Sequence, residues 1–306
     1  MDTLIKSLVQ AKLDPERIIP RAIMARYTTF HIGGPADVLV NISAPGEIPL
    51  ALRAAKQAGA PVTVIGNGSN VLVRDGGIRG LVIRIDGAMN AVRREGDTII
   101  AQAGALMRTV ANFALNEGLT GLEEIAGIPG TIGGGVIMNA GAYGGELAQV
   151  VTHVSGVSLE DGKNVSFEGD ELGFGYRKSA MMHAGVIVTE VTMQLRPGDP
   201  VQIKARMEEL AKARREKQPL EYPSAGSTFK RPEGYFAAKL IDDCGLRGLS
   251  VGDAQVSEKH AGFVINRGSA RAGDVLELMD QIRVRVFDTY GVALEPEIRI
   301  LGEDAL

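Results

Sequence analysis

The chain has 306 residues, enough for more than one domain with a hydrophobic core of its own. Hydrophobic residues make up 45% and charged residues 23% of it, a balance that is typical of globular proteins and argues against intrinsic disorder. The formal net charge of −4 excludes the strongly basic surface that collects nucleic acid.

The N-terminal segment, residues 1–13, has the pattern of an amphipathic helix. It carries Asp2, lacks an unbroken apolar run and is followed by no small-residue cleavage site, which argues against a signal peptide. No segment approaches the roughly 18 consecutive apolar residues of a membrane span. The single cysteine, Cys244, excludes an internal disulfide bond and fits a reducing compartment. We therefore expect a cytoplasmic protein.

The first half of the chain mixes short strands with helices. We expect an irregular segment at 14–28. Apolar patterns predict strands at 36–42, at both ends of 61–73, at 80–85 and at 97–103. Helical spacing of apolar residues predicts helices over 46–58 and 106–118, the second with a glycine at its end.

The second half begins with a glycine-rich segment, 121–145. Strands are predicted at 150–159, 164–167, 186–195, 261–266 and 294–300, and helices at 201–218, 236–243 and 272–290, with a polar turn over 222–230. Because this order lacks the regular βαβ alternation of a doubly wound sheet, it predicts an α+β architecture.

A glycine loop lies between two hydrophobic strands in VIGNGSNVLV. Glycine allows positive φ and close approach of a ligand, and successive amides in such a turn form a concavity that binds anions, of which pyrophosphate is the natural one here. A simple hairpin turn explains the pattern equally well. It is not a Rossmann fingerprint, because a strand follows it where that motif opens a helix. The expected ligand contacts are Gly66, Asn67, Gly68, Ser69 and Asn70.

A second glycine cluster, GIPGTIGGGVIMNAGAYGG, predicts one short helical turn after Pro129 that presents amides to phosphate. The small residues after it suit a flat ring packed against backbone. The alternative is a tightly packed crossing of chains, which also requires glycine. The expected cofactor contacts are Gly130, Thr131, Gly133, Gly134, Ala140 and Ala142.

Six motifs in this order resemble those of the UDP-N-acetylenolpyruvoylglucosamine reductase family: TTFHIGGPAD, VIGNGSNVLV, GIPGTIGGGVIMNAGAYGGE, GYRKS, AGSTFK and LEPEIRI. The resemblance extends from about residue 27 to residue 302. It implies an FAD-binding fold of the vanillyl-alcohol oxidase (PCMH) type. We expect an N-terminal helix over 1–14, an FAD-binding domain over 15–198 whose two subdomains meet near 90–110, and a C-terminal α+β substrate-binding domain over 199–306.

The resemblance also implies the reaction: NADPH reduces non-covalently bound FAD, which reduces the enolpyruvyl ether of a UDP-amino sugar to UDP-N-acetylmuramate for peptidoglycan. It assigns Arg177 to stabilising negative charge on the substrate carboxylate, Ser227 to protonation and Glu297 to supporting the enolate oxygen. Taken singly, each has an ordinary explanation as a surface arginine, a turn hydroxyl or a strand carboxylate. Substrate contacts are expected at Tyr143, Lys230, Arg231, Lys239, Asn266 and Arg299.

The interval between Arg177 and Ser227 holds one strand and one charged helix, so the chain resembles the form of the family without an inserted tyrosine loop. The four histidines have no ligand spacing, and no metal is expected. We expect a monomer without an obligate protein partner. Two alternatives remain: another FAD-dependent oxidoreductase acting on a hydroxy acid or alcohol, and a non-catalytic nucleotide-binding protein.

Overall fold

The computed structural model describes residues 1–305, which form two compact units. The first unit comprises Met1–Pro20, Val38–Asn67 and Gly80–Arg214. The second comprises Arg21–Asp37, Gly68–Arg79 and the described part of the chain from Arg215 onward. Each unit has its own hydrophobic core, so two short segments from the first third of the sequence belong with the C-terminal third.

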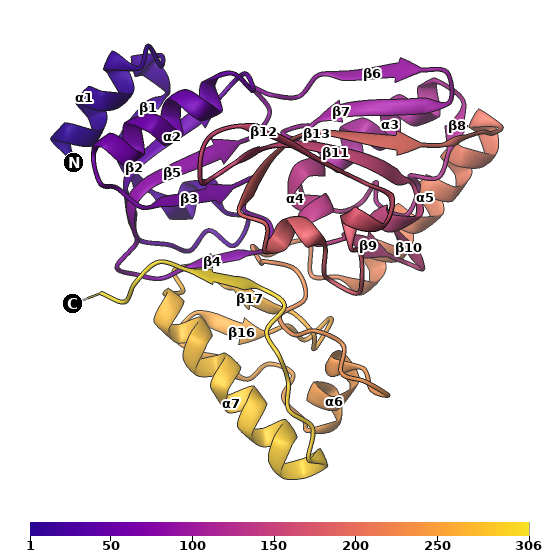
Figure 1. The fold of residues 1–306 in the computed structure, drawn as a ribbon. Coiled ribbons are helices and arrows are strands. Elements are labelled where there is room, and N and C mark those ends of the chain that lie inside the picture. The colour runs from indigo at the N-terminus through magenta and orange to yellow at the C-terminus, as the bar shows by residue number, and fades with distance from the viewer. Residues whose placement is uncertain (306) are drawn as a thin grey trace. The chain divides into compact units, whose positions relative to one another are not determined.

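A four-stranded sheet in the order β1-β2-β5-β3 belongs mostly to the first unit. The helices α1 and α2 contact each other beside it (Figure 1). Apolar residues of both helices, including Leu8, Ile48 and Ala51, are fully buried in the core. The elements are α1 (Asp2–Gln10), β1 (Ile18–Ile23), β2 (Pro35–Ile42), α2 (Glu47–Gln57), β3 (Val62–Ile65) and β5 (Ile78–Ile85).

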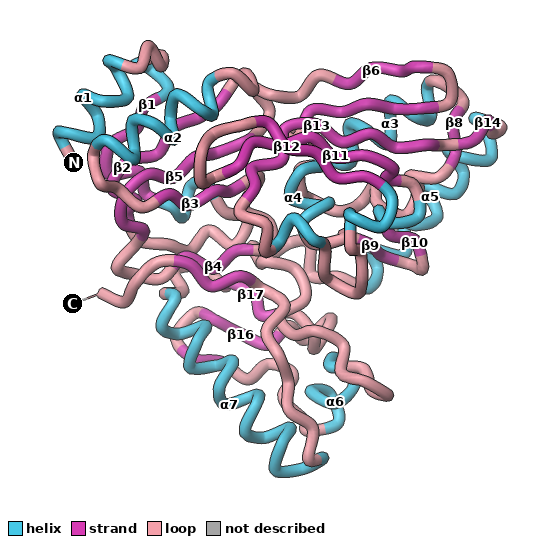
Figure 2. The backbone as a smooth tube through the Cα atoms, viewed as in Figure 1, coloured by secondary structure: helices cyan, strands magenta, loops and turns pink. Residues whose placement is uncertain are grey.

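An antiparallel five-stranded sheet in the order β12-β11-β13-β7-β6 forms the other part of this unit (Figure 2). The short helix α4 contacts β7, β13 and α3, which places its glycine-rich sequence against the sheet. The elements are β6 (Val92–Glu95), β7 (Thr98–Gln102), α3 (Met107–Asn116), α4 (Ile132–Ile137), β11 (Val151–Ser158), β12 (Asn164–Glu168) and β13 (Val186–Gln194).

Two short strand pairs, of which only β9–β10 is a hairpin, and one long helix complete the first unit. The pair β8 (Leu119–Thr120) and β14 (Arg196–Pro197) and the pair β9 (Gly141–Ala142) and β10 (Gly145–Glu146) are both antiparallel. The helix α5 (Pro200–Lys217) is charged along most of its length, with only Ile203 and Leu210 buried. The division between the units falls inside this helix, after Arg214.

The second unit packs α7 against a three-stranded sheet, β15-β16-β17. A parallel pair joins β18 to β4, with Arg299 opposite Val71. Its core includes Phe30 and Leu72, which come from the two early segments. The elements are β4 (Val71–Val73), α6 (Ala237–Asp243), β15 (Ser250–Val251), β16 (Ala254–Val256), β17 (Val264–Asn266), α7 (Ala272–Tyr290) and β18 (Arg299–Leu301).

The mixture of helices and antiparallel and parallel strands confirms the α+β class. The segment 14–28, expected to be irregular, instead contains β1, in which only Ile18 and Ala22 are buried. At the other end, the strand expected over 294–300 is regular only from Arg299. The two units divide the chain by packing rather than by motif, and the boundaries at 14/15 and 198/199 stay predictions.

Candidate active site

The two glycine loops meet inside the first unit. Asn67 donates from Nδ2 to the carbonyl of Pro129 over 2.6 Å. A Cβ added to Gly66 would lie 2.5 Å from the hydroxyl of Thr131, so only glycine fits there. Among the described residues, the amides of Asn67, Gly130 and Thr131 donate to no protein acceptor. These neighbouring free amides suit an anionic or carbonyl-bearing ligand.

The end of the first loop belongs to the second unit. Gly68 is buried at φ 63°, and a Cβ there would collide with the carbonyl of Tyr27. Within residues 1–305, the amides of Gly68, Ser69 and Asn70 also lack a protein acceptor. Three successive free amides are the donors that an anion-binding turn needs. A simple hairpin turn does not require them.

The helical turn predicted after Pro129 exists as α4, with Thr131 at its N-cap. The prediction that its first amides face phosphate is wrong, because the protein itself uses them. Ile132 donates to Ala105 over 2.7 Å, Gly133 donates to Ala103 over 2.9 Å and Gly134 donates to the Thr131 hydroxyl over 3.3 Å.

Two glycines of α4 are packed against neighbouring residues, and one is exposed. A Cβ on Gly133 would lie 2.7 Å from that of Ala103, and one on Gly135 would lie 3.0 Å from Leu147, so a close crossing explains both. Gly134 is exposed, and Ala140 and Ala142 are half-buried. These three leave a surface of small groups on which a flat ring can rest.

Arg177 lies in a two-residue turn of the first unit. Gly175 and Lys178 exchange backbone hydrogen bonds of 3.0 and 3.1 Å, which leaves Tyr176 and Arg177 at the tip of what we call the Arg177 turn, residues 175–178. Arg177 has φ 53°, and its guanidinium donates to the carbonyl of Gly141 over 3.3 Å. A non-glycine residue in this conformation is uncommon and is found preferentially at functional positions.

Two buried polar side chains hold this turn against the end of α4. Asn139 is 0% exposed and donates from Nδ2 to the carbonyl of Gly175 over 3.1 Å, while its Oδ1 accepts from the amide of Ala148 over 2.9 Å. Ser179, also 0% exposed, donates to the carbonyl of Ile137 over 2.8 Å. Both ends of the Arg177 turn are therefore fixed.

Ser227 and Glu297 lie on adjoining antiparallel segments of the second unit. The amide of Glu297 donates to the carbonyl of Thr228 over 2.9 Å, and Phe229 pairs with Pro296. Both candidate residues are half-buried. Asn70, from the first glycine loop, donates from Nδ2 to the carbonyl of Glu297 over 3.2 Å. The structure thus brings the serine motif, the glutamate motif and part of the glycine loop together in one unit.

The expected substrate contacts differ in what they can do. Tyr143 is 39% exposed with φ 54°, at the tip of what we call the Tyr143 turn, residues 142–145. Lys230 forms an ion pair of 3.1 Å with Glu295, and Lys239 pairs with Asp243. The Arg231 guanidinium stacks 3.9 Å from the ring centroid of Phe236. These pairings are exposed, so a ligand phosphate can replace them at low cost.

Asn266 is only 2% exposed and uses its amide within the unit. It donates to the carbonyl of Phe30 over 3.2 Å and accepts from Gly268 and Ala270. This arrangement favours a structural role over the expected ligand contact. Arg299 is exposed at the start of β18, and Glu297 precedes that strand, so strand alternation does not place the two on one face.

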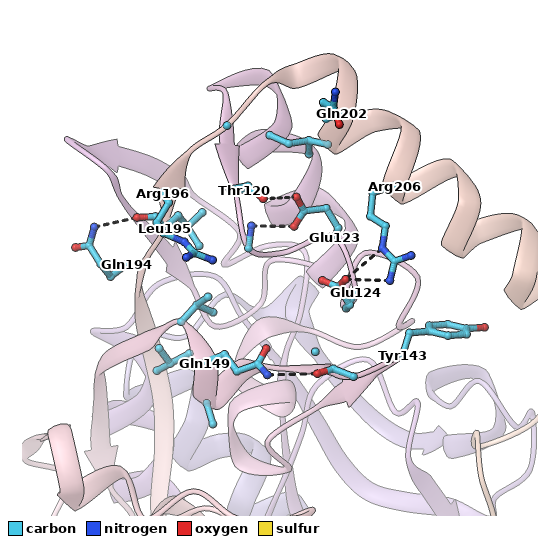
Figure 3. Close-up of a pocket in the computed structure, with 18 of the residues that line it drawn as sticks. Thr120, Glu123, Glu124, Tyr143, Gln149, Gln194, Leu195, Arg196, Gln202 and Arg206 are labelled. Carbon is cyan, nitrogen blue, oxygen red and sulfur yellow. Dashed lines mark hydrogen bonds and ion pairs between the residues drawn. The ribbon is translucent and has the colours of Figure 1, made fainter.

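An open groove of about 1140 Å³ lies beside Tyr143 in the first unit (Figure 3). Across it, Glu124 pairs with Arg206 of α5 over 3.4 Å. Glu123 is 7% exposed and accepts from the Thr120 hydroxyl and the Gly121 amide. Of the predicted site residues only Tyr143 lines this groove, and the predicted catalytic residues do not.

Arg214 adds a half-buried cation near the Tyr143 turn. Burial lowers the pKa of its guanidinium, and the neighbouring Tyr143 hydroxyl acts in the opposite direction. A Cβ on Gly127 would come within 2.8 Å of Arg214 Nη1, so a glycine makes room for it. Among residues 1–305 no group of three or more His, Cys, Asp or Glu side chains is arranged to hold a metal. Nor does that part of the chain contain a helix both long and apolar enough to cross a bilayer.

Two family models match the chain. The C-terminal domain of UDP-N-acetylenolpyruvoylglucosamine reductase matches residues 218–301, and an FAD binding domain matches residues 36–168. A reductase of that name from Clostridium novyi is 48% identical over 98% of this chain and 97% of its own length. One from Geobacillus kaustophilus is 48% identical over 92% of each chain.

The chain belongs to the UDP-N-acetylenolpyruvoylglucosamine reductase family.

Solved structures agree with this membership. The reductase of the same family from Thermus caldophilus superposes with a TM-score of 0.79 at 39% identity, covering 93% of this chain and 98% of its own. An alkyldihydroxyacetonephosphate synthase covers 64% of this chain with a TM-score of 0.50 at 15% identity, a likeness of fold alone. The predicted family and the predicted FAD-binding fold are confirmed.

Sequence reasoning missed the two residues that hold the Arg177 turn. Asn139 is a lone polar residue in an apolar and glycine-rich stretch, and Ser179 directly follows the turn. A polar residue in such a stretch signals a buried hydrogen bond. The acceptor of Asn139, the carbonyl of Gly175, lies 36 positions further along the chain and carries no sequence signal.

Proposed function

We propose that the protein reduces the enolpyruvyl ether of UDP-N-acetylglucosamine to UDP-N-acetylmuramate, with NADPH as electron donor and FAD as cofactor, in the synthesis of peptidoglycan precursor. The observation that carries the proposal is the pairing of the segments 227–230 and 295–298, which joins the hydroxyl and carboxyl motifs in a chain of this family. Bound FAD supplies the hydride chemistry between NADPH and the substrate double bond.

The residues present fit FAD. In the first unit, the free amides of Asn67, Gly130 and Thr131 provide donors, and Gly134, Ala140 and Ala142 provide a surface without bulk. In the second unit, the amides of Gly68, Ser69 and Asn70 provide a further set of donors. A dinucleotide needs both kinds of contact, donors for its phosphates and a flat apolar support for its rings.

Arg177 is proposed to bind the substrate carboxylate. A guanidinium keeps its charge and can grip a carboxylate through two parallel hydrogen bonds. Negative charge moves into this carboxylate when the neighbouring double bond is reduced. A fixed cation therefore stabilises the transition state more than the ground state, and such preorganised charge is usually the largest catalytic contribution. The strained and doubly anchored Arg177 turn supports this role.

Ser227 is proposed to donate the proton that completes the lactyl ether. A hydroxyl can deliver a proton to one face of a carbon when the backbone that carries it is fixed, as the pairing of Thr228 with Glu297 fixes it here. The carboxyl of Glu297 is proposed to support the oxygen of the substrate carboxylate by hydrogen bonding. Lys230 is close to Ser227 in sequence, and its side chain forms an ion pair with Glu295.

A visible spectrum of the purified protein, followed by NADPH and then substrate, tests the function. We expect a flavin absorbance that NADPH bleaches and that the enolpyruvyl ether restores. Steady NADPH oxidation without this substrate, or with hydroxy acids in its place, would contradict the proposal and favour a different oxidoreductase.

Replacing Ser227 separates the two halves of the reaction. In Ser227→Ala, NADPH should bleach the flavin at the wild-type rate, because the hydroxyl serves only substrate protonation. Reoxidation by substrate should fall by a factor on the order of 10²–10⁴. The matched control is Ser250→Ala, an exposed serine of the same unit bonded to its own turn. Rapid reoxidation of Ser227→Ala in stopped-flow absorbance would refute the role of the serine.

We further propose that the protein acts as a monomer in the cytoplasm without an obligate protein partner. The single cysteine supports the location, because it fits a reducing compartment. Sedimentation equilibrium of the FAD-loaded protein measures the monomer directly.

A further inference from the structure

The Arg177 turn and the segment that follows the Tyr143 turn are joined through one buried side chain. Asn139 Nδ2 donates to the carbonyl of Gly175 in the Arg177 turn, and Asn139 Oδ1 accepts from Ala148, which follows the Tyr143 turn. Both turns belong to the first unit, and each has a non-glycine residue at positive φ, 53° for Arg177 and 54° for Tyr143. Asn139 itself has φ 43°, a conformation that asparagine tolerates better than most residues.

A second contact links the same segments. The guanidinium of Arg177 donates to the carbonyl of Gly141, which is only two residues from Asn139 and pairs with Glu146 in the hairpin β9–β10. The segment 139–141 therefore contacts both the backbone of the Arg177 turn and the guanidinium of Arg177. A buried amide without a partner is costly, so this arrangement is strongly preferred while Asn139 is intact.

We propose that Asn139 is a positioning residue, which sets the place of the Arg177 guanidinium relative to Tyr143 and the surface of Ala140 and Ala142. This inference rests on the proposed function, because it concerns how the substrate carboxylate meets Arg177. Asn139 is fully buried, and both hydrogen bonds of its side chain are made within the protein. Its effect on the reaction passes through the arginine.

The selective variant is Asn139→Asp, which keeps the acceptor for Ala148 and removes the donor to Gly175. Asn139→Gly removes both hydrogen bonds without adding charge, and glycine adopts the positive φ freely. FAD content and bleaching by NADPH should stay within about twofold of wild type, whereas reoxidation by substrate should fall on the order of 10–100-fold, because small displacements of a catalytic group are costly.

A double-mutant cycle distinguishes positioning from general destabilisation. In an Arg177→Ala background, the further change Asn139→Asp should alter the single-turnover reoxidation rate less than about threefold, because the group that Asn139 positions is already gone. Equal losses in both backgrounds, or wild-type reoxidation in Asn139→Asp, would overturn the inference.

Ser179→Ala gives a second variant if the asparagine variants fold poorly, since it removes only the hydrogen bond to Ile137. We expect the same selective loss of reoxidation, smaller in size. Its matched control is Ser43→Ala, which removes part-buried hydrogen bonds to Arg17 and Glu47 elsewhere in the same unit. A selective loss in the control equal to that in Ser179→Ala would overturn the positioning role.

Hydrogen exchange separates failure of this inference from failure of the proposed function. In Asn139→Asp, the amides of Gly175 and Lys178 should exchange faster than in wild type, whatever reaction the protein catalyses. Unchanged exchange at these amides would overturn the inference even in an active enzyme. A wild-type protein that fails to reduce the enolpyruvyl ether would instead overturn the function, and leave accelerated exchange as evidence for the link between the turns.

Discussion

At Gly68 the backbone takes the left-handed conformation with the carbonyl of Tyr27 directly where a side chain would begin. Two requirements therefore coincide at this residue, positive φ and the absence of a Cβ. Either alone is met by several residues of the chain, for example Gly291, which has φ 68° and open space around it. Comparing Gly68 with Gly291 separates the free-energy cost of the left-handed conformation from that of the collision.

We predict that Gly68→Ala destabilises the protein by about 2–4 kcal/mol, because strain and collision add. Gly291→Ala, the matched control, should cost about 1 kcal/mol from strain alone. Urea unfolding followed by circular dichroism measures both. Flavin retention should fall in Gly68→Ala only, since this glycine opens the run of free amides. Equal stability losses in the two variants would show that the neighbourhood of Tyr27 yields easily.

The role of a single residue was predictable where only one residue type meets the physical requirement at its position. Positive φ was expected in the first glycine loop, and Gly68 has it at 63°. The expected close approach of a ligand stays a prediction, because the atoms that crowd Gly66 and Gly68 belong to Thr131 and Tyr27. The fate of the α4 amides was not predictable, because their acceptors, Ala103 and Ala105, come from a different part of the chain. Arg177, Ser227 and Glu297 stay predictions as catalytic residues.

The helix α7 shows how a remote residue completes an element. Asp75 accepts from the amides of Ala272 and Gly273, both over 3.0 Å, and so caps a helix that begins almost 200 positions later. A carboxylate at this end also interacts favourably with the helix dipole. The cap ties the early segment Gly68–Arg79 to the C-terminal part of its own unit.

We predict that Asp75→Ala lowers the free energy of unfolding by about 1–2 kcal/mol through loss of this cap. Asp280→Ala removes an exposed carboxylate from the same helix and should change stability by less than about 0.5 kcal/mol. Thermal unfolding of both variants provides the comparison. A loss in Asp280→Ala as large as that in Asp75→Ala would mean that charge, rather than capping, is responsible.

Long periodic elements were the most predictable. The helices α5 and α7 agree with the expected ranges 201–218 and 272–290 within one residue, because their patterns are long. Short elements were less predictable. β1 was missed because its six residues, Ile18–Ile23, have an irregular burial pattern, and β18 is short because Pro296 cannot donate to a ladder.

At the scale of the whole molecule, packing does not follow chain order. Phe30, Ile32 and Leu72 contribute to the core of the second unit, although most of that core comes from beyond residue 224. Sequence patterns report local periodicity and could not reveal this interleaving, since nothing in residues 21–37 or 68–79 marks their partners. The motif-based boundary at 198/199 therefore leaves out pieces that this core uses.

We predict that a fragment of residues 199–306 does not unfold cooperatively, because it lacks β4, the partner of β18, and three buried residues of its core. Circular dichroism on heating should show a broad, shallow change, in contrast to a sharp transition in the full chain under the same conditions. A sharp transition in the fragment would show that the early segments are dispensable for this core.

The parallel pairing of β4 with β18 also determines how late in its synthesis the chain can complete this pair. Asn70 and Glu297, which bond at its edge, are 227 positions apart, and a ribosome needs on the order of 10–50 s to add that many residues. Throughout that interval the edge of β4 has no strand to pair with, and unpaired edges invite association with other chains. Early protection of this short segment, by a chaperone or by transient contacts, is thus a condition for a good yield of the enzyme.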